Sequence, residues 1–594
     1  MQPLPASKST YMPGLDGLRT FAVFAVILFH LNINYIPGGF LGVDLFFVLS
    51  GYLITGILLR EWANAGRIDL KRFYVARFRR LLPALIFLLS VVMTYVTLFE
   101  RELLDTVRTD TLAALAYVNN WWYIFHDVSY FESFGKPSPI QNLWSLSIEE
   151  QFYLVWPLLL IIGLKSKRRF LQVVGTLLFA SVAWMALQFT PGEDPSRVYY
   201  GTDTRLFALL VGALLAFGWR PDTFKRDMPV IGRRILNVGG GIALVSLIVM
   251  MMTTSSYGSF LYYGGFLLVA LASAVLIAAT AHPTTRWARL FGSGWLRIIG
   301  ARTYGIYLWH YPVIILTTPL EQIGSFSPLL ALVQVAVTLM MAELSYRFIE
   351  TPIRRNGFRA TLRKLVPNRQ TRPSRLVAVT MLTTLSLVLV GNLTILAFTE
   401  QSEPTEVPVV EAPKPKPEPP AETLPEERPV ESCPPALAIG DSVLLGLNEY
   451  LGSEFPNMKI DAELGRQVKD AQDVAMNYRE YDAPGHVVFF HLGTNGAFKM
   501  EQLDTLIDMF SSSDHIYLIN TRVPRPWERE VNEKLQRASE LHDSVTLIDW
   551  HEASAGHGNY FENDGVHLNI HGAEAFGELL SEEIGCNKKE GLSD

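Results

Sequence analysis

The chain has 594 residues, 49% of them hydrophobic, and its mean hydropathy is +0.21, which is high for a soluble protein. The formal net charge of −6 combines a basic first part with an acidic remainder: residues 1–399 hold 36 basic and 20 acidic side chains, and residues 400–594 hold 15 and 37. The acidic remainder argues against nucleic acid as a partner.

Apolar stretches of about 20 residues recur along the first 400 residues and are long enough to cross a bilayer. The first of them lacks a small-residue cleavage site and is followed at once by more apolar sequence, so we expect a multi-pass membrane protein and no cleaved signal peptide. Eleven such stretches are predicted near residues 18–35, 40–59, 81–99, 143–164, 170–189, 204–219, 235–253, 261–281, 304–320, 328–349 and 376–398.

Basic residues predict the orientation of these stretches. With the N-terminus inside, the cytoplasmic segments hold 28 Lys and Arg and the outer segments hold 5. Because basic residues favour the cytoplasmic side, the N-terminus is predicted to be cytoplasmic. Eleven crossings then place everything after residue 398 outside the cell.

Residues 401–432 are rich in Pro and Glu and cannot bury a core, so we expect an extended spacer. At roughly 3 Å per residue its contour length approaches about 100 Å. The two cysteines, Cys433 and Cys586, bracket the module that follows. If that module is extracellular, a disulfide between them is expected, and two buried free thiols are the alternative.

Polar residues at membrane depth are expensive and often functional. Arg19 and His30 are eleven residues apart in the first predicted helix and therefore lie roughly on one face. Further motifs are Gly38–Tyr52, which contains Asp44; Arg79-Arg80-Leu81-Leu82-Pro83; Trp144–Tyr153, which contains Glu149 and Glu150; Tyr304–His310; and Glu350-Thr351-Pro352.

Together these motifs resemble the acyltransferase-3 family of integral membrane acyltransferases, over about residues 11–355. The resemblance implies ten helices, an acyl-coenzyme A donor on the cytoplasmic side and His30 as the catalytic histidine. A neutral imidazole can act as a base or as a transient acyl acceptor. The other candidates are Arg19, Arg79 and Arg80 for the coenzyme phosphates, Glu149 or Glu150 to position a histidine, Asp203 and Arg205 to line an exit path, and Asp44 and His310.

Six of the membrane candidates also have a structural alternative. Arg79 and Arg80 could be cytoplasmic anchors, and Arg19 lies close enough to the interface to snorkel. Asp44 could be a packing or helix-end residue. His30 and His310 could be structural histidines.

From residue 433 onwards, short apolar strands alternate with helical stretches, which predicts a parallel sheet covered on both faces. In such folds sites form at the carboxyl ends of the strands, and Ser442, Gly465 and Asn495 closely follow strands. The predicted strands are 436–439, 459–462, 486–491, 515–520 and 544–549, and the predicted helices lie near 443–454, 467–480, 499–511, 527–541 and 569–584.

A serine at a strand-to-helix turn gains from the backbone donors of the helix N-terminus. We expect His567 to take the proton of Ser442 and Asp564 to orient the imidazole. The Ser442 and Gly465 N–H groups and the Asn495 side-chain amide would form an oxyanion hole. Alternatively, Ser442 is a helix cap and Asp564 a loop residue. His551, His557 and His571 lack the Asp-x-x-His context and are expected to be surface or loop residues.

The ordered set Gly440-Asp441-Ser442, Gly465, Gly493-Thr494-Asn495 and Asp564-Gly565-Val566-His567 resembles the SGNH (GDSL) hydrolase superfamily across residues 433–590. No Gly-x-Ser-x-Gly elbow surrounds Ser442, which disfavours the α/β-hydrolase fold. The expected architecture is thus a membrane domain of ten helices (1–355), an eleventh linking helix (376–398), a spacer (400–432) and an extracellular α/β domain (433–590).

Both resemblances in one chain, together with the segments 12–19 and 461–467, resemble the peptidoglycan O-acetyltransferases of Gram-positive bacteria. That implies transfer of acetyl from cytoplasmic acetyl-CoA, through an acetyl-serine at Ser442, to the muramoyl 6-hydroxyl, which protects the wall from lysozyme. Acetyl-CoA is then a substrate, and no cofactor or metal is expected. The alternatives are acetylation of an O-antigen, teichoic acid or exopolysaccharide, an extracellular acetylesterase, and a membrane part that is a transporter or lipid-binding scaffold. The oligomeric state is not predicted.

Overall fold

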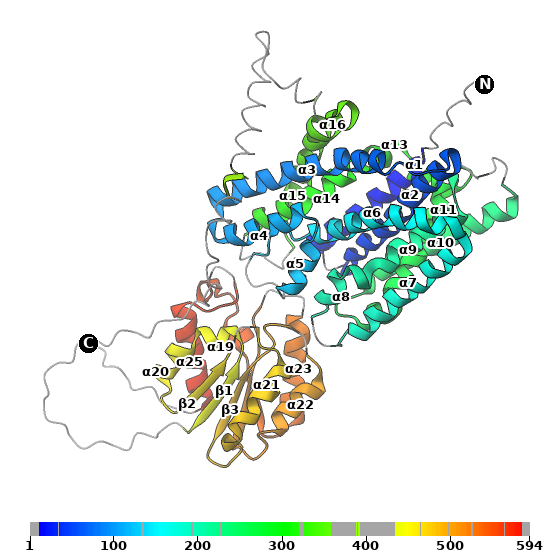
Figure 1. Ribbon diagram of the computed structural model, residues 1–594. Helices are drawn as coiled ribbons and strands as arrows, with labels where there is room; N and C mark the ends of the chain where they lie inside the picture. The colour runs from blue at the N-terminus through cyan, green and yellow to red at the C-terminus, as the bar shows by residue number, and fades with distance from the viewer. Residues whose placement is uncertain are drawn as a thin grey trace, which may run out of the picture.

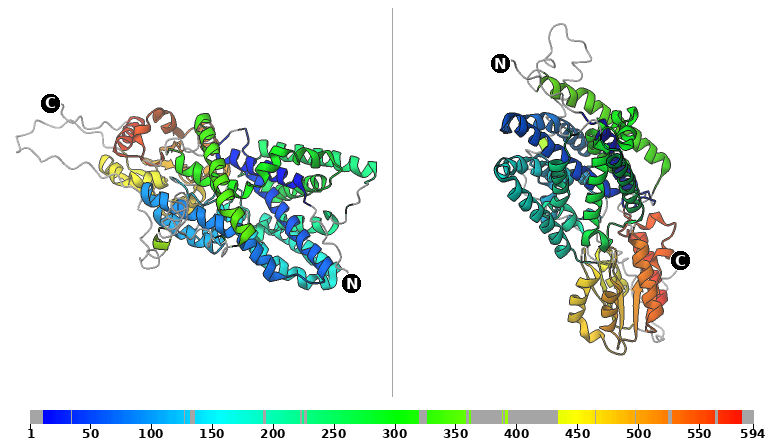
Figure 2. Two further views of the ribbon diagram at one scale, coloured as in Figure 1. Left: turned by 90° about the horizontal axis from the view of Figure 1, so that it is seen from above. Right: turned by 90° about the vertical axis from the view of Figure 1, so that its right-hand side faces the viewer.

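The computed structural model consists of a helical domain and an α/β domain (Figure 1). The second domain lies against one end of the first, next to α5 (Asn119–Phe125) and α8 (Ser196–Tyr200), and two further views agree on this placement (Figure 2). The structure describes residues 11–33, 35–126, 128–131, 136–191, 194–221, 224, 228–319, 326–357, 361, 388, 390–392, 434–463, 465–496, 498–523, 527–562 and 565–584.

Long helices dominate the first domain. Seven stretches among the described residues are long and apolar enough, by length and composition, to cross a membrane. The main helices besides α5 and α8 are α1 Pro13–His30, α2 Gly42–Ala65, α3 Leu70–Phe99, α4 Leu104–Leu115, α6 Leu143–Gly163, α7 Lys167–Gln188, α9 Thr202–Gly218, α10 Val230–Thr253, α11 Phe266–Ala281, α12 Arg286–Phe291, α13 Gly294–Gly300, α14 Thr303–Thr317, α15 Pro328–Leu344 and α16 Thr351–Asn356.

Each of the first ten predicted spans coincides with a helix, but α9 and α14 are short and, unlike α11 and α15, are not prolonged by an adjoining helical turn. α9 has 17 residues and α14 has 15, below the roughly 20 that an upright crossing needs. α6 and α7 are separated only by the short 3-10 turn Leu164–Ser166. Of the predicted eleventh helix, residues 388 and 390–392 are described and are helical, and the remainder lies outside the described residues.

Helices α2 and α9 pack backbone to backbone through glycines. A Cβ atom on Gly51 would lie 1.9 Å from the carbonyl oxygen of Leu209, and one on Gly212 would lie 2.0 Å from that of Val48. Small residues allow such an approach between helices, which in lipid is stabilised by van der Waals packing. This contact fixes α2 relative to α9 and brings their polar side chains together.

The second domain contains five parallel strands in the order β2-β1-β3-β4-β5. Each predicted strand is confirmed to within about two residues at either end. The strands are β1 Ala436–Gly440, β2 Met458–Ala462, β3 Val487–His491, β4 His515–Ile519 and β5 Val545–Ile548. The helices are α19 Ser442–Gly446, α20 Asn448–Glu454, α21 Val468–Ala475, α22 Met500–Asp508, α23 Glu528–Leu541, α24 Trp550–Ala553 and α25 Ile570–Ile584.

Successive residues along each strand pack alternately into two separate apolar cores, one on each face of the sheet. Leu437 and Phe490 belong to one core, which also takes residues from α21, α22 and α23. Ala438 and Phe489 belong to the other, with residues from α19, α20 and α25. The sheet is therefore covered on both faces, as the near-continuous apolar strands predict. The chain moves from β1 outward to β2 and then across to β3, so the strand order reverses at β1, where ligand sites form in such sheets.

We predict that Gly51→Ala destabilises the first domain by about 2 kcal/mol, because the added methyl group overpacks the contact with α9. Thermal unfolding of the detergent-solubilised full chain measures the effect. Gly56→Ala is the matched control on the same helix, because nothing lies within 4 Å of its Cβ position. Equal effects of the two substitutions would contradict the proposed role of the α2–α9 contact.

Candidate active site

Ser442 lies at the turn between β1 and α19, where the sequence analysis placed it. Its side chain is fully buried, and its Oγ has no hydrogen-bond partner among the described residues. A buried hydroxyl normally has a partner, since leaving one unpaired costs about 1–3 kcal/mol. Ser442 is therefore the first residue of α19, and its hydroxyl makes no hydrogen bond to the described residues.

Asp441, and not Ser442, caps α19. Its Oδ1 accepts a hydrogen bond from the Val443 N–H at 3.2 Å, and its Oδ2 accepts one from the Thr494 N–H at 3.2 Å. This fully buried carboxylate thus ties the loop after β1 to the loop after β3. The alternative that Ser442 serves as the cap has no support in this geometry.

The loops after β2 and β3 carry the predicted oxyanion donors. Gly465 has φ +79°, and a Cβ there would meet nothing within 4 Å. Asn495 is buried and donates from its Nδ2 to the carbonyl oxygen of Arg466 at 3.3 Å. It follows Gly493, whose φ of +109° and close contact with Val531 suit only glycine.

Arg466, which the sequence analysis gave no role, holds the Gly465 loop in place. Its buried guanidinium donates to the Gly440 carbonyl at 3.2 Å and to the carbonyl and Oδ1 of Asp461, both at 2.7 Å. Burial alone would raise the pKa of the Asp461 carboxyl, but hydrogen bonds from Tyr478 and Arg466 lower it below its usual range. The Asp461 hydrogen bond, aided by burial, raises the pKa of the Tyr478 hydroxyl to about 12.

His567 is buried on the loop that precedes α25. Its neighbours Val566 and Leu568 pack into the same apolar core as Val443 and Leu444, which follow Ser442. The His567 carbonyl accepts from the Glu562 N–H at 2.7 Å, which closes the loop. The predicted partner Asp564 lies outside the described residues, and so do Cys433 and Cys586.

The other histidines of this domain lie in different surroundings. The ring of His551 contacts Glu528 at 3.1 Å, His557 stacks on Tyr560, and His571 is largely exposed. His491 is a buried residue that the sequence analysis missed: it ends β3, with Nδ1 3.6 Å from Oδ1 of Asp441.

A second cluster of polar groups surrounds His30 at the end of α1. The His30 Nε2 lies 2.9 Å from the Tyr130 hydroxyl, and its Nδ1 lies 3.2 Å from Nε2 of His310. The His310 Nδ1 in turn lies 2.7 Å from the carbonyl oxygen of Tyr307. The structure thus brings the two predicted histidines together and adds Tyr130, which the sequence analysis missed.

When both rings are neutral, these contacts assign their tautomers. A carbonyl oxygen only accepts, so the His310 Nδ1 carries hydrogen and its Nε2 accepts from the His30 Nδ1–H. The His30 Nε2 then has no hydrogen and accepts the Tyr130 hydroxyl. The arrangement leaves a basic ring nitrogen on His30.

Asp44 and Arg205 form a fully buried ion pair between α2 and α9. The Arg205 Nη2 lies 2.9 Å from both carboxylate oxygens of Asp44, and the guanidinium lies over the ring of Phe266 at 4.0 Å. Arg205 therefore has a packing role in this structure. Asp203, the other residue expected at an exit path, is partly exposed and pairs with Arg197 at 2.9 Å.

Arginines gather at the opposite end of the first domain. They line a cavity of about 410 Å³, and Arg19, Arg77, Arg80, Ser50 and Tyr153 also line a smaller one of about 90 Å³ that reaches Tyr307. The arginines of the larger cavity are Arg19, Arg60, Arg77, Arg80 and Arg220.

Of the arginine and glutamate candidates Arg19, Arg79, Arg80, Glu149 and Glu150, two line neither cavity. Arg79 lies next to Gly357 and lines neither of them. Glu149 lines the smaller cavity and accepts hydrogen bonds from Ser50 and Tyr153, whereas Glu150 lines neither. The described hydrogen bonds of Glu149 do not include a histidine.

Comparison with known proteins identifies the first domain. A family model described as an acyltransferase domain matches residues 12–342. The chain is 42% identical to the YrhL protein of Bacillus subtilis, over 96% of this chain and 98% of that protein. It is also 42% identical to peptidoglycan O-acetyltransferase OatA of Listeria monocytogenes, with the same coverage. An acyltransferase domain excludes the transporter or scaffold alternative for the membrane part.

Among solved structures, the chain is similar to the C-terminal catalytic domain of peptidoglycan O-acetyltransferase A from Streptococcus pneumoniae. The identity is 18%, the TM-score is 0.23, and the alignment covers 26% of this chain and 93% of that one. The fold of the second domain is defined by its own strand order, β2-β1-β3-β4-β5.

We predict that Arg205→Met lowers the free energy of unfolding by about 3–5 kcal/mol, because it leaves a buried carboxylate without a partner. The double substitution Asp44→Asn with Arg205→Met should recover part of this loss. Denaturant titration of the detergent-solubilised chain measures both. Arg197→Met is the control, since its partly exposed pair contributes at most about 1 kcal/mol. No recovery in the double variant would contradict the ion-pair account.

Proposed function

The chain belongs to the acyltransferase family that contains the peptidoglycan O-acetyltransferase OatA, and we propose that it transfers acetyl groups from acetyl-CoA to peptidoglycan. The observation that carries the proposal is the presence of two separate buried polar clusters, around Ser442 and around His30, in one chain that matches OatA over 96% of its length. A hydrolase acting at the cell surface would need only the centre at Ser442. A transferase with a cytoplasmic donor needs the second centre in the membrane domain as well.

The basic cavity supports a donor that carries phosphates. Coenzyme A has three phosphate groups, and arginines bind phosphate through paired N–H groups. The cavity lies at the end of the domain that the charge pattern predicts to be cytoplasmic. Arg77 and Arg80 are common to both cavities, so the reactive end of the donor would extend past them into the smaller cavity, toward Tyr307.

His30 would act on the thioester of that donor. Its unprotonated Nε2 can serve as the base or as the transient acyl acceptor, and the chain through His310 to the Tyr307 carbonyl keeps the ring in this tautomer. His310 would thus be a positioning residue. Tyr130 occupies the Nε2 lone pair and must move aside or donate its proton when the nitrogen reacts.

At the second centre the acetyl group would form an ester with Ser442. The Ser442 oxygen attacks the acetyl carbonyl carbon while its proton passes to His567, and His567 gives this proton to the departing donor group, so that the imidazole is neutral again. The muramoyl 6-hydroxyl then attacks the ester, gives its proton to His567, and Ser442 departs and is reprotonated. The Ser442 and Gly465 N–H groups and one amide hydrogen of Asn495 would stabilise the oxyanion, while the other amide hydrogen of Asn495 holds the Arg466 carbonyl.

The product would be a wall whose muramic acid is acetylated, which protects it from lysozyme. We place the α/β domain on the outer side of a bacterial cell membrane, in reach of the glycan. If the acceptor is instead another envelope glycan, the chemistry of both centres remains the same.

We predict that Ser442→Ala and His30→Ala each abolish muramic acid O-acetylation in cells that have no other copy of the enzyme. Mass spectrometry of muropeptides before and after mild base treatment measures the acetyl group. His571→Ala is the control, since its side chain is largely exposed. Acetylation that persists in the Ser442 variant would contradict the acetyl-serine, and an acetyl group on a different polymer would identify another acceptor.

We predict that Arg466→Gln lowers the turnover number for acetyl transfer by about 10- to 100-fold, because the Gly465 loop loses its anchor to β1 and β2 and the oxyanion donors shift. Steady-state transfer to a soluble glycan acceptor by the full chain measures this. Arg529→Gln is a control on the exposed surface of α23. A fall in melting temperature without a change in turnover would show that Arg466 acts only in stability.

A further inference from the structure

The loops of the membrane domain that the charge pattern predicts to be outer lie against the catalytic edge of the second domain. In Figure 1, α19, which begins at Ser442, lies on the side of its domain that faces the membrane domain. The ring of Tyr257, in the loop after α10, lies 5.8 Å from the ring of Trp527, which precedes α23. Tyr257 packs against the apolar core to which Trp527 belongs.

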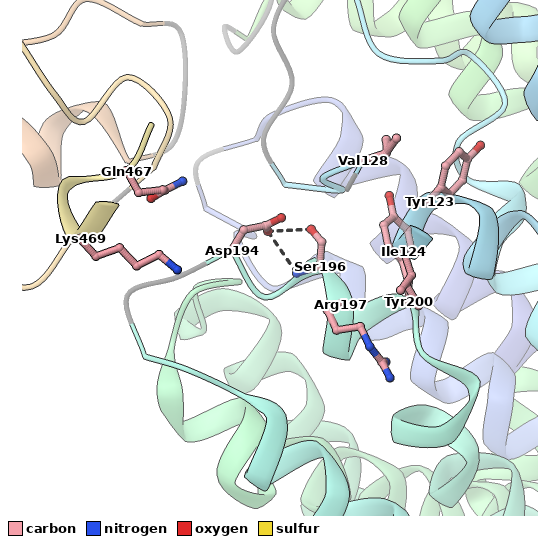
Figure 3. A pocket seen from close by; sticks show the side chains of 9 residues that line it. All are labelled: Tyr123, Ile124, Val128, Asp194, Ser196, Arg197, Tyr200, Gln467 and Lys469. Atoms are coloured by element: carbon pink, nitrogen blue, oxygen red, sulfur yellow. Dashed lines mark hydrogen bonds between the residues drawn. The ribbon is translucent and has the colours of Figure 1, made fainter. Parts of the chain in front are cut away.

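A cavity of about 240 Å³ lies between the two domains (Figure 3). Gln467 and Lys469 line it from the second domain, and Ser196 and Tyr200 are among the residues that line it from the membrane domain. In Figure 3 the side chains of Gln467 and Lys469 extend toward the segment that carries Asp194. The cavity is thus built by both domains together.

One wall of this cavity is bonded to the serine centre. The Gln467 side chain donates to the Asn495 carbonyl at 2.8 Å, and Asn495 is a predicted oxyanion donor. Gln467 also follows Gly465 and Arg466 directly in the chain. The cavity therefore lies next to the loops that hold the reacting oxygen.

The opposite wall is bonded to the histidine centre. The Ser196 hydroxyl accepts from the Tyr130 N–H at 2.8 Å, and the Tyr130 hydroxyl contacts His30. The Tyr200 hydroxyl accepts from Gln141 at 2.9 Å, and Gln141 accepts from Tyr311, whose ring lies 4.8 Å from that of His30. Each centre is thus a few contacts from the same cavity.

Water has little access to the serine centre in this arrangement. The side chains of Ser442, Thr494, Asn495 and His567 are all at most 5% exposed. An ester formed on Ser442 here would be shielded from hydrolysis, and a glycan polymer would have no room to reach it. The state that protects the ester therefore differs from the state that delivers it.

We infer that the outer loops around Tyr257 and Ser196 form a docking surface for the carboxyl edge of the C-terminal sheet, and that the docked form receives the acetyl group sheltered from water while the released form delivers it to the glycan. This inference rests on the proposed function. The Pro- and Glu-rich sequence of residues 401–432 predicts a tether of about 100 Å contour, which is long enough for release.

Tyr257→Ala in the full chain, reconstituted in lipid nanodiscs, tests the inference. Loss of an aromatic pair should shift the docking equilibrium by about two- to ten-fold. We expect hydrolysis of 4-nitrophenyl acetate at Ser442 to rise by that factor, and acetyl transfer from acetyl-CoA to a glycan acceptor to fall. Opposite changes in two reactions of one serine are not produced by partial unfolding.

Two variants serve as controls. Tyr257→Phe keeps the ring and should behave as the unsubstituted chain does. Phe260→Ala, in the helical segment that follows the Tyr257 loop and with its side chain exposed, should change neither reaction. Unchanged or jointly reduced reactions in Tyr257→Ala would overturn the docking inference. If the unsubstituted chain does not acetylate the glycan at all, the proposed function fails, whereas the hydrolysis measurement still reports on docking.

Discussion

A polar group that is removed from water must find a partner, and this constraint decides the structure of both domains. In the membrane domain it is met by the Asp44–Arg205 pair, which the glycine contact between α2 and α9 brings together. The same constraint is met by a chain of hydrogen bonds that joins Tyr130, His30 and His310 and ends at the Tyr307 carbonyl. In the second domain, Asp441 accepts hydrogen bonds from two loops and Arg466 donates to two strands, whereas the Ser442 hydroxyl is one of several buried polar atoms that have no partner among the described residues.

Much of the second domain was predictable from the sequence because its signals are local. Short apolar runs bounded by polar turns specify the five strands, and the parallel order follows from the alternation with helices. The motifs at Ser442, Gly465 and Asn495 follow their strands directly, so the sheet brings them to one edge. Arg466 was harder to recognise, since its partners Gly440 and Asp461 belong to two different strands.

Two different reasons explain why the sequence analysis missed residues of the membrane domain. Tyr130 is 100 positions from His30 and reaches it through a loop, so no sequence period relates them. Arg77 could have been found, because it is three residues before Arg80 and shares its helix face, whereas Arg79 points elsewhere. Arg79 and Arg80 are adjacent in the sequence motif, but adjacent residues of a helix point in different directions, and only residues three or four apart share a face. Arg60 and Arg220 come from separate helix ends and are united only by folding.

The hydrogen bond from Gln467 to Asn495 has a thermodynamic consequence. Gln467 lines the space between the domains and also restrains the backbone of a residue at the serine centre. If Ser442 carries an acetyl group as proposed, a change in how the domains meet would alter the stability of that ester. By thermodynamic linkage, acetylation of Ser442 would then alter the affinity between the domains by the same factor. Acetylation would then regulate its own release, with no effector beyond the acetyl group itself.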